Sequence, residues 1–289
     1  MQALRTITSF DQLDVSLDDP RTALVLALAD DDLVMGHRAL HWTGVAPSIE
    51  EDIAFSGVAQ DEINHADVWY QLVVASAARP GSGDGDREQV DALGLGRLPD
   101  QYRHAVLLER EPGDFAFTLA RHWLYDHADT VRLRSLGQST DPDIAAIANK
   151  LLHEERYHVR HADTWFWALV RGGDEPRRRL REALRQTFEG ALWLFEPTAG
   201  EQDLVDAGVM PVGSGEWLTR WLDVVGAMLE EAELDDAVSG VRRPEAGDWL
   251  VPSDLFDAGG GRRGQHTHEW TQAWQEMTEL YRAHPGANW

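Results

Sequence analysis

The chain has 289 residues, with 26 basic and 50 acidic side chains and a formal net charge of −24. This length suffices for one large domain with its own core, and the negative charge argues against nucleic acid and anionic membranes as partners. No run of 18 apolar residues occurs and the N-terminal segment does not resemble a signal peptide, so we expect a cytoplasmic protein. Since cysteine is absent, any metal would need oxygen and imidazole ligands.

Apolar residues recur every three or four positions through most of the chain, which predicts an all-α fold. The first helix is expected from about Asp19 to Thr43. The second begins after Ser48, a candidate N-cap with Glu51 three residues later. The third begins near Asp114 and the fourth after residues 141–143. Further helices are expected at 174–195, 214–237 and 266–284, with turn-rich segments at 78–86, 196–203, 211–216 and 251–265.

The core-facing stripes of the first four helices share one anomaly. Each stripe is apolar at both ends and carries carboxylate or imidazole side chains in the middle. A buried carboxylate is too costly to remain unpaired, so these positions require cations or metals. The polar stripe residues are Asp32 on the first helix, Glu62 and His65 on the second, Asp126 on the third, and Glu155 and His158 on the fourth.

The second and fourth helices each contain a Glu-x-x-His motif, Glu62 to His65 and Glu155 to His158. Residues three apart leave the same face of a helix one turn apart, so both side chains can reach one cation. Two such helices and one acid from each of two others form the dimetal site of ferritin-like bundles. Roughly one such motif is expected by chance, so the prediction rests on both motifs lying on core stripes. The expected cofactor is two Fe or Mn ions, which share this ligand set.

Periodicity leaves several ligand choices open. Asp31 competes with Asp32, in a run of acids that could equally be a solvent-exposed patch. Asp126 competes with Asp129. His122, on the same stripe as Asp126, is more often a hydrogen-bonded core histidine than a ligand.

Two further acids could hold the histidines in place. Asp61 lies one turn before His65, and Glu154 lies one turn before His158. Each is a candidate to accept a hydrogen bond from the outer ring N–H of that histidine. Solvent exposure of both acids is the alternative.

Three stretches, at 107–126, 141–165 and 259–289, resemble the PaaC subunit family of the bacterial phenylacetyl-CoA epoxidase. The resemblance covers most of the chain and implies a single ferritin-like domain over 1–289, a four-helix bundle with additional C-terminal helices. PaaC subunits are similar to the catalytic subunit PaaA, which carries the di-iron site and binds the CoA substrate. In that family PaaC is usually a structural partner that has lost most ligands.

This sequence departs from that pattern. Residues 60–65 and 32–48 resemble ligand helices of PaaA, and the resemblance places ligands at Asp32 and Asp126. All six ligand positions are therefore filled, as Asp32, Glu62, His65, Asp126, Glu155 and His158. Two hypotheses follow, an O2-activating oxygenase component and a structural subunit with a vestigial site. An iron-storing or peroxide-consuming ferritin relative is a third, and the PaaC-like C-terminus argues against it.

The resemblance also implies partners. These are a PaaA-like catalytic subunit, the other epoxidase subunits, and a separate reductase. A reductase is needed because the chain has neither cysteines for iron–sulfur clusters nor a Gly-x-Gly-x-x-Gly motif for a flavin or nicotinamide cofactor. A homodimer is a further assembly that the sequence leaves open.

Two other features carry alternatives. The twelve tryptophans suit large aromatic contacts with a partner, or simply pack the bundle core. The glycine-rich segment 259–265 has the composition of a phosphate cradle, which would suit a CoA phosphate, although a plain turn into the last helix is favoured.

Overall fold

The computed structural model describes residues 9–77, 86–244, 247–285 and 287, so the expected loop at 78–86 falls outside it except for its last position. In these ranges the regular structure is helical, apart from one antiparallel bridge between Arg242 and Leu250. The prediction of an all-α fold is therefore confirmed. No helix of the described ranges has an apolar stretch long enough to cross a bilayer.

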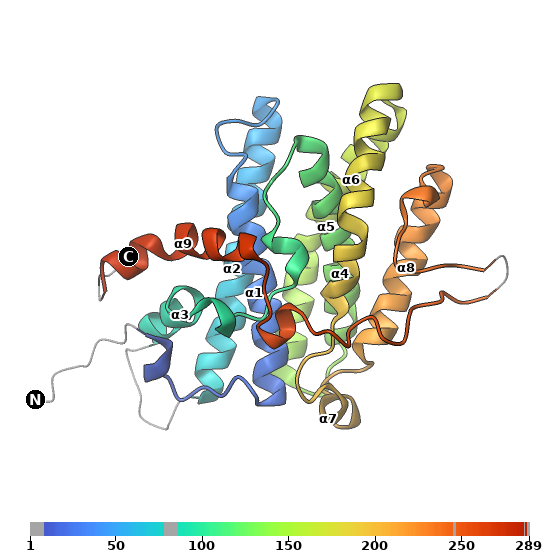
Figure 1. Ribbon diagram of the computed structural model, residues 1–289. Helices are drawn as coiled ribbons and strands as arrows, with labels where there is room; N and C mark the ends of the chain where they lie inside the picture. The colour runs from blue at the N-terminus through green and yellow to red at the C-terminus, as the bar shows by residue number, and fades with distance from the viewer. Residues whose placement is uncertain (1–8, 78–85, 245–246, 286, 288–289) are drawn as a thin grey trace, which may run out of the picture.

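Two helical hairpins form the bundle, as expected for a ferritin-like fold (Figure 1). The first hairpin consists of α1 (Pro20–Leu40) and α2 (Ile49–Ala77), and the second of α4 (Phe115–Leu136) and α5 (Pro142–Arg171). On the outer side of α4 lie α6 (Asp174–Leu192) and α8 (Ser214–Glu231). The remaining helices are α3 (Asp86–Leu95), the short α7 (Glu201–Asp206) and α9 (His268–Ala283), with α3 and α9 on the side of the first hairpin.

Local capping explains where the bundle helices begin. At each start a short polar side chain accepts a hydrogen bond from a free backbone N–H of the first turn. These acceptors are Asp19 for Thr22 (2.9 Å), Ser48 for Glu51 (3.3 Å), Asp114 for Phe117 (2.9 Å) and Asp141 for Ile144 (3.2 Å). The helix starts predicted at these four places are confirmed. Two helices end earlier than predicted. α1 stops at Leu40 instead of Thr43, and α8 stops at Glu231 instead of residue 237.

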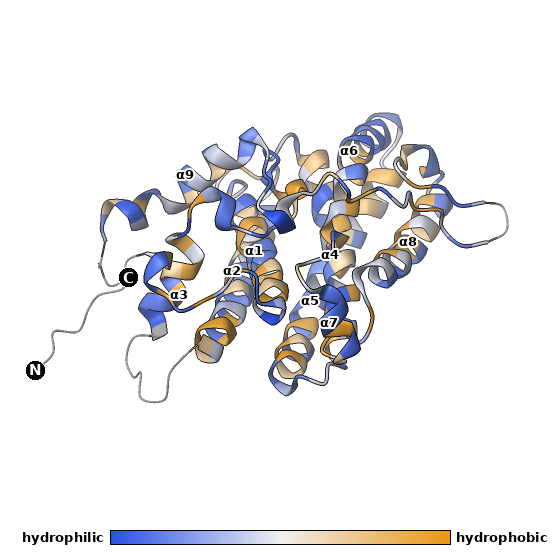
Figure 2. Cartoon of the chain, turned by 60° about the horizontal axis from the view of Figure 1, so that its bottom comes forward, coloured by the Kyte–Doolittle hydropathy of each residue, from blue (hydrophilic) through white to orange (hydrophobic). Residues whose placement is uncertain are grey.

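The core is centred on α4, because helices pack on several of its sides and bury almost every residue from Ala116 to Leu136. Trp123 stacks on Phe166 of α5 with ring centroids 4.4 Å apart, and the indole N–H of Trp221 donates to the carbonyl of Leu124 (3.1 Å). Both tryptophans are almost completely buried, and each such side chain contributes roughly 3 kcal/mol to stability. These tryptophans pack the core. Figure 2 shows the hydrophilic residues of α6 turned away from the bundle.

Candidate metal centre

The acidic run on α1 is buried, so the solvent-exposed alternative is wrong. Asp30, Asp31 and Asp32 have at most 3% of their surface exposed. Asp30 accepts from Tyr70 (2.5 Å) and pairs with Arg97. Consecutive side chains leave a helix about 100° apart, so each acid meets a different environment. The three carboxylates therefore have separate roles.

Asp31 and Asp32 are distinguished by what they contact. The carboxylate of Asp31 pairs with Arg132 of α4 (2.5 Å) and with Arg262 of the C-terminal segment (2.7 Å). Asp32 instead accepts a hydrogen bond from the hydroxyl of Tyr125 (2.6 Å). One oxygen of Asp32 lies within 4.8 Å of ligand atoms of Glu62 and His65. The geometry thus places Asp32 with the candidate ligands and assigns Asp31 to a buried ion-pair network.

The two Glu-x-x-His motifs face one another across the bundle, on α2 and α5. Their four side chains are at most 1% exposed, and the imidazole rings of His65 and His158 lie 6.0 Å apart. Ligand atoms of Glu62, Glu155 and His158 fall within 4.8 Å of one another, forming a second group beside that of Asp32. Glu62 belongs to both groups. Two neighbouring cation positions with Glu62 between them would satisfy this arrangement.

The outer nitrogens of the two histidines bond across the helix pair. Nε2 of His65 on α2 lies 2.8 Å from Glu154 of α5, and Nε2 of His158 on α5 lies 3.4 Å from Asp61 of α2. The predicted pairing along each helix is therefore wrong, because each acid reaches the facing helix. A metal-binding histidine typically donates its second N–H to a carboxylate in this way.

With Nε2 engaged, the Nδ1 atoms point into the candidate centre. Nδ1 of His65 has no hydrogen-bond partner in the described part of the chain. Nδ1 of His158 lies 3.1 Å from Glu155 and 3.3 Å from Glu62. Both histidines thus present the nitrogen that a cation would use.

Asp126 of α4 lies beside the two groups, not within them. It is fully buried, and neither carboxylate oxygen has a hydrogen-bond partner among the described residues. Nδ1 of His122 lies 3.2 Å away, but without hydrogen-bonding geometry. The competing Asp129 is bonded to Arg132 (2.9 Å). Of the two acids of α4, Asp126 is the one whose oxygens are uncommitted.

His122 differs from the expected hydrogen-bonded core histidine. It is fully buried on α4, and both ring nitrogens lack a hydrogen-bond partner in the described ranges. Burial lowers its pKa well below the usual value, with a further contribution from His158. The sequence signal was its place on the same stripe as Asp126.

Burial and mutual repulsion raise the pKa values of the clustered acids. Burial is the largest cause for Asp32, Asp126 and Glu155, and neighbouring carboxylates add to it. The pKa of Glu155 rises to about 8. Burial lowers the pKa of His158, but its close contacts with Asp61, Glu155 and Glu62 outweigh burial and raise that pKa overall. Without a metal, protonated His158 supplies positive charge to these carboxylates, but it cannot balance all four of them.

The uncommitted atoms fit a pair of divalent cations. Buried polar atoms almost always have partners, so several in one place call for an explanation. Two cations would supply four positive charges to four carboxylates, with the histidines as neutral ligands. Among the six predicted ligands, the donor atoms without a hydrogen-bond partner in the described ranges are Glu62 Oε1, His65 Nδ1, both Asp126 oxygens and Glu155 Oε1.

The glycine-rich segment 259–265 is held by hydrogen bonds within the chain, so the phosphate-cradle alternative is wrong. Glu196 accepts from the backbone N–H groups of Gly260 (2.7 Å) and Arg262 (3.0 Å), donors that a phosphate would need. A Cβ at Gly261 would meet the carbonyl oxygen of His104 at 1.7 Å, so only glycine fits there. The side chain of Arg262 is buried against Asp31. Sequence reasoning missed this anchoring role.

A second histidine–carboxylate group fastens the same segment. His266 Nδ1 lies 2.6 Å from Glu109, and its Nε2 lies 3.1 Å from the carbonyl of Tyr102. His104 stacks nearly parallel to His266, with centroids 4.5 Å apart. These three side chains approach closely enough to bind an ion. However, both nitrogens of His266 already have hydrogen-bond partners, and two parallel rings cannot both direct a nitrogen at one cation. The group is therefore a set of hydrogen bonds that holds the segment in place.

Comparison with known proteins places the chain in a family. A family model described as "Phenylacetic acid catabolic protein", covering PaaA and PaaC, matches residues 1–289. The chain belongs to this family. It is also similar to the PaaC subunit of the 1,2-phenylacetyl-CoA epoxidase of Escherichia coli strain K12, with 29% identity over 268 residues. That alignment covers 93% of this chain and 98% of the relative. The family resemblance expected from the sequence is confirmed.

Proposed function

We propose that the chain is a PaaC-type subunit of a multicomponent phenylacetyl-CoA epoxidase and that it holds a dimetal centre of its own. The observation that carries the dimetal part is the facing pair of Glu-x-x-His motifs, in which Glu62 Oε1, His65 Nδ1 and Glu155 Oε1 are buried without a hydrogen-bond partner among the described residues. Similarity to the Escherichia coli PaaC subunit over nearly its full length supports the assembly part. The expected partners are a PaaA-like catalytic subunit, other epoxidase subunits and a separate reductase.

In this centre Asp32, Glu62, His65, Glu155 and His158 would hold the pair of ions. Asp126 supplies the remaining carboxylate from α4. When bound, a pair of Fe or Mn ions would supply O2 activation.

The chain itself orients the ligands and excludes water. Glu154 and Asp61 fix the imidazole rings, and Tyr125 fixes the carboxylate of Asp32. A small apolar cluster that includes Phe55 and Leu119 shields one side, with the ring of Phe55 5.6 Å from that of His122. A dry, preorganised pocket is what metal-centred oxygen chemistry requires of its protein.

A scaffold without catalytic metal is the second candidate function. The position of Asp126 favours it, since this residue lies outside both close donor groups. The Escherichia coli relative is also a PaaC subunit, and the family resemblance implies a structural role for such subunits. In this case the chain would shape its catalytic partner, and the ligand set would be vestigial.

Metal analysis separates the two candidates. The purified chain should contain about two Fe or Mn per chain. A Glu62→Ala/Glu155→Ala double variant should contain none, and its circular dichroism should match the parent. A chain that binds no metal, with a double variant that supports full epoxidase activity, would overturn the dimetal part.

A second experiment tests catalysis directly. The chain is reconstituted with partner subunits in which the ligand glutamates of the PaaA-like subunit are replaced by alanine. Residual epoxidation of phenylacetyl-CoA that disappears with Glu62→Ala assigns catalysis to this chain. Complete loss of activity with metal still bound assigns it the scaffold role. Failure of the parent chain to associate with the subunits would overturn the assembly proposal.

A further inference from the structure

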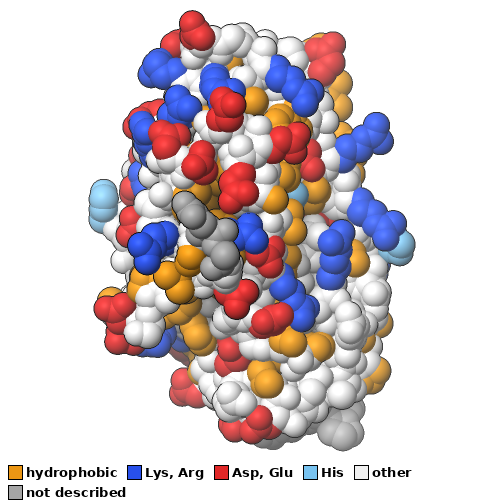
Figure 3. All heavy atoms as spheres, turned by 90° about the vertical axis from the view of Figure 1, so that its right-hand side faces the viewer, with side chains coloured by type: hydrophobic (Ala, Val, Ile, Leu, Met, Phe, Trp, Pro, Cys, Tyr) orange, Lys and Arg blue, Asp and Glu red, His pale blue; other side chains and the backbone are white. Residues whose placement is uncertain are grey.

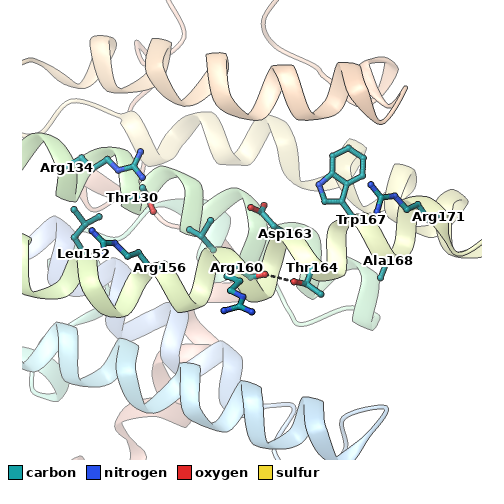
Figure 4. Close-up of a pocket in the computed structure, with 11 residues that line it drawn as sticks. Thr130, Arg134, Leu152, Arg156, Arg160, Asp163, Thr164, Trp167, Ala168 and Arg171 are labelled. Atoms are coloured by element: carbon teal, nitrogen blue, oxygen red, sulfur yellow. Dashed lines mark hydrogen bonds between the residues drawn. The ribbon is translucent and has the colours of Figure 1, made fainter.

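A long groove runs along the outward side of α5 and the end of α4 (Figure 4). Its volume is about 660 Å³. The lining combines arginines with apolar side chains such as Leu152 and Val159, and Trp167 lies near one end. Glu155 and His158 occupy the opposite, buried face of α5, so the groove is separate from the candidate metal centre.

Four exposed arginines of this groove have no carboxylate partner in the described ranges, namely Arg134, Arg156, Arg160 and Arg171. The one acid of the lining, Asp163, is already engaged by the indole N–H of Trp123 and by His127, each at 2.9 Å. The groove therefore has a local excess of positive charge on a chain whose net charge is −24.

Several surface arginines elsewhere are neutralised within the chain. Arg185 pairs with Asp236 (2.5 Å) and Arg220 with Glu216 (2.9 Å). Figure 3 shows acidic and arginine side chains intermixed over the neighbouring face of the molecule. An uncompensated row of arginines next to such a surface indicates an external acidic partner.

The shape of the groove favours a helix over a compact anion. From Leu152 to Arg171 the lining follows α5 for about 28 Å, at a rise of 1.5 Å per residue. Figure 4 shows the arginines spread along this length instead of converging on one point. Lining positions recur every three or four residues, which is the spacing a second helix meets when it packs along the first. The guanidinium of Arg171 lies over the ring of Trp167 (5.0 Å to the centroid), leaving an amphipathic end to the groove.

We propose that this groove docks an acidic amphipathic helix of another subunit. Glutamates or aspartates at helical spacing would pair with the arginines, and apolar residues between them would cover Leu152, Val159 and Trp167. The inference rests on the proposed function as a subunit. Nucleic acid and anionic membranes fit poorly, because the rest of the chain would repel them.

A labelling experiment locates the partner. The chain has no cysteine, so Thr164→Cys introduces a single reactive thiol into the groove while keeping all four arginines. Thr219→Cys on α8 is the matched control, because both threonines are hydrogen-bonded to the carbonyl four residues earlier. A thiol-linked photo-crosslinker at position 164 should capture an acidic helical segment of a partner subunit in the assembled complex. Capture of a non-acidic segment, or no capture beyond that of the control, overturns the inference.

Charge reversal tests the arginines themselves. Arg160→Glu should weaken affinity for the partner subunits about ten-fold at low salt, and the difference should shrink as salt is added. Arg242→Glu is the control, because Arg242 is exposed, lies outside the groove and forms no ion pair within the described ranges. Equal binding by both variants overturns the inference while the proposed function stands. If the parent chain does not assemble at all, both fail.

A third arm uses the chain alone with inorganic pyrophosphate. An environment-sensitive dye at position 164 should not respond to it at millimolar concentration. A saturable response that Arg160→Glu abolishes would make the groove a small-anion site and overturn the docking proposal.

Discussion

Nε2 of His65 on α2 lies 2.8 Å from the carboxylate of Glu154 on α5, while Nε2 of His158 on α5 faces Asp61 on α2. Each helix therefore supplies the group that orients the histidine of the other. The positions of α2, α5 and their histidines therefore depend on one another, because a shift of either helix breaks both contacts. This reciprocity yields the first prediction.

We expect Glu154→Gln and Asp61→Asn each to lower metal affinity about 10–100-fold, since the partner that fixes a ligating imidazole is lost or weakened. Competition with a chelator measures the change. Glu231→Gln is the control, because Glu231 is exposed on α8. Unchanged affinity in both substituted proteins would show that these carboxylates do not orient the ligands.

Asp126→Asn should stabilise the metal-free protein near neutral pH. Burial and neighbouring carboxylates raise the pKa of Asp126, so the folded state binds its proton more tightly than the unfolded state. Its contribution is therefore present below the ordinary pKa of 3.8 and is lost as pH rises toward the higher folded value. The gain in melting temperature should be absent at pH 3 and present at pH 7. A melting temperature that is unchanged at both pH values would contradict this account.

Asp129→Asn is the matched comparison for that experiment. Asp129 is bonded to Arg132, whose second partner is Asp31, so the substitution weakens a buried ion pair. Burial and Glu62 also raise the pKa of Asp129, but Arg132 opposes that rise. We therefore expect Asp129→Asn to raise the melting temperature at pH 7 less than Asp126→Asn does. A smaller gain for Asp129→Asn would support the assignment of Asp126 as the uncommitted acid, and an equal gain would contradict it.

Metal binding should release protons. In the metal-free protein burial raises the pKa of Glu155 to about 8, so this acid is largely protonated at pH 7. A cation favours the ionised form, and ligands must lose their protons before they bind. Calorimetric titration in buffers of different ionisation enthalpy measures the release, which should shrink as the pH rises above 8. A release that does not depend on pH would contradict a shared proton among these carboxylates.

Arg262→Met should destabilise the protein by about 3–5 kcal/mol, because among the described residues it leaves the buried Asp31 with Arg132 alone as a countercharge. Arg263→Met is the matched control, since Arg263 is half exposed and lies 3.7 Å from Glu196. Urea denaturation followed by circular dichroism compares the two. Equal stability of the two variants would show that Arg262 does not hold the C-terminal segment in place.

Local patterns in the sequence predicted the local features of the structure. Caps such as Ser48 and the three-residue spacing of Glu62 and His65 act within one helix, so they are readable without tertiary information. Contacts between distant segments were not readable. The partner of Asp31 is 231 residues away at Arg262, and no periodicity signals it. Glu154 was linked to His158 because both lie on one helix, whereas the packing of α2 on α5 turns it toward His65.

The contact of Arg262 with Asp31 has a consequence for when the fold can form during synthesis. Residues after α8 run back across the bundle to reach α9 (Figure 1), and Arg262 supplies part of the positive charge that Asp31 needs. Domains generally fold as the chain leaves the ribosome, N-terminal parts first. Here α1 is made early, and the second countercharge of Asp31 follows 231 residues later. We therefore expect the bundle to lock only after translation has passed residue 262, so that loading of the candidate centre depends on synthesis of the C-terminal segment.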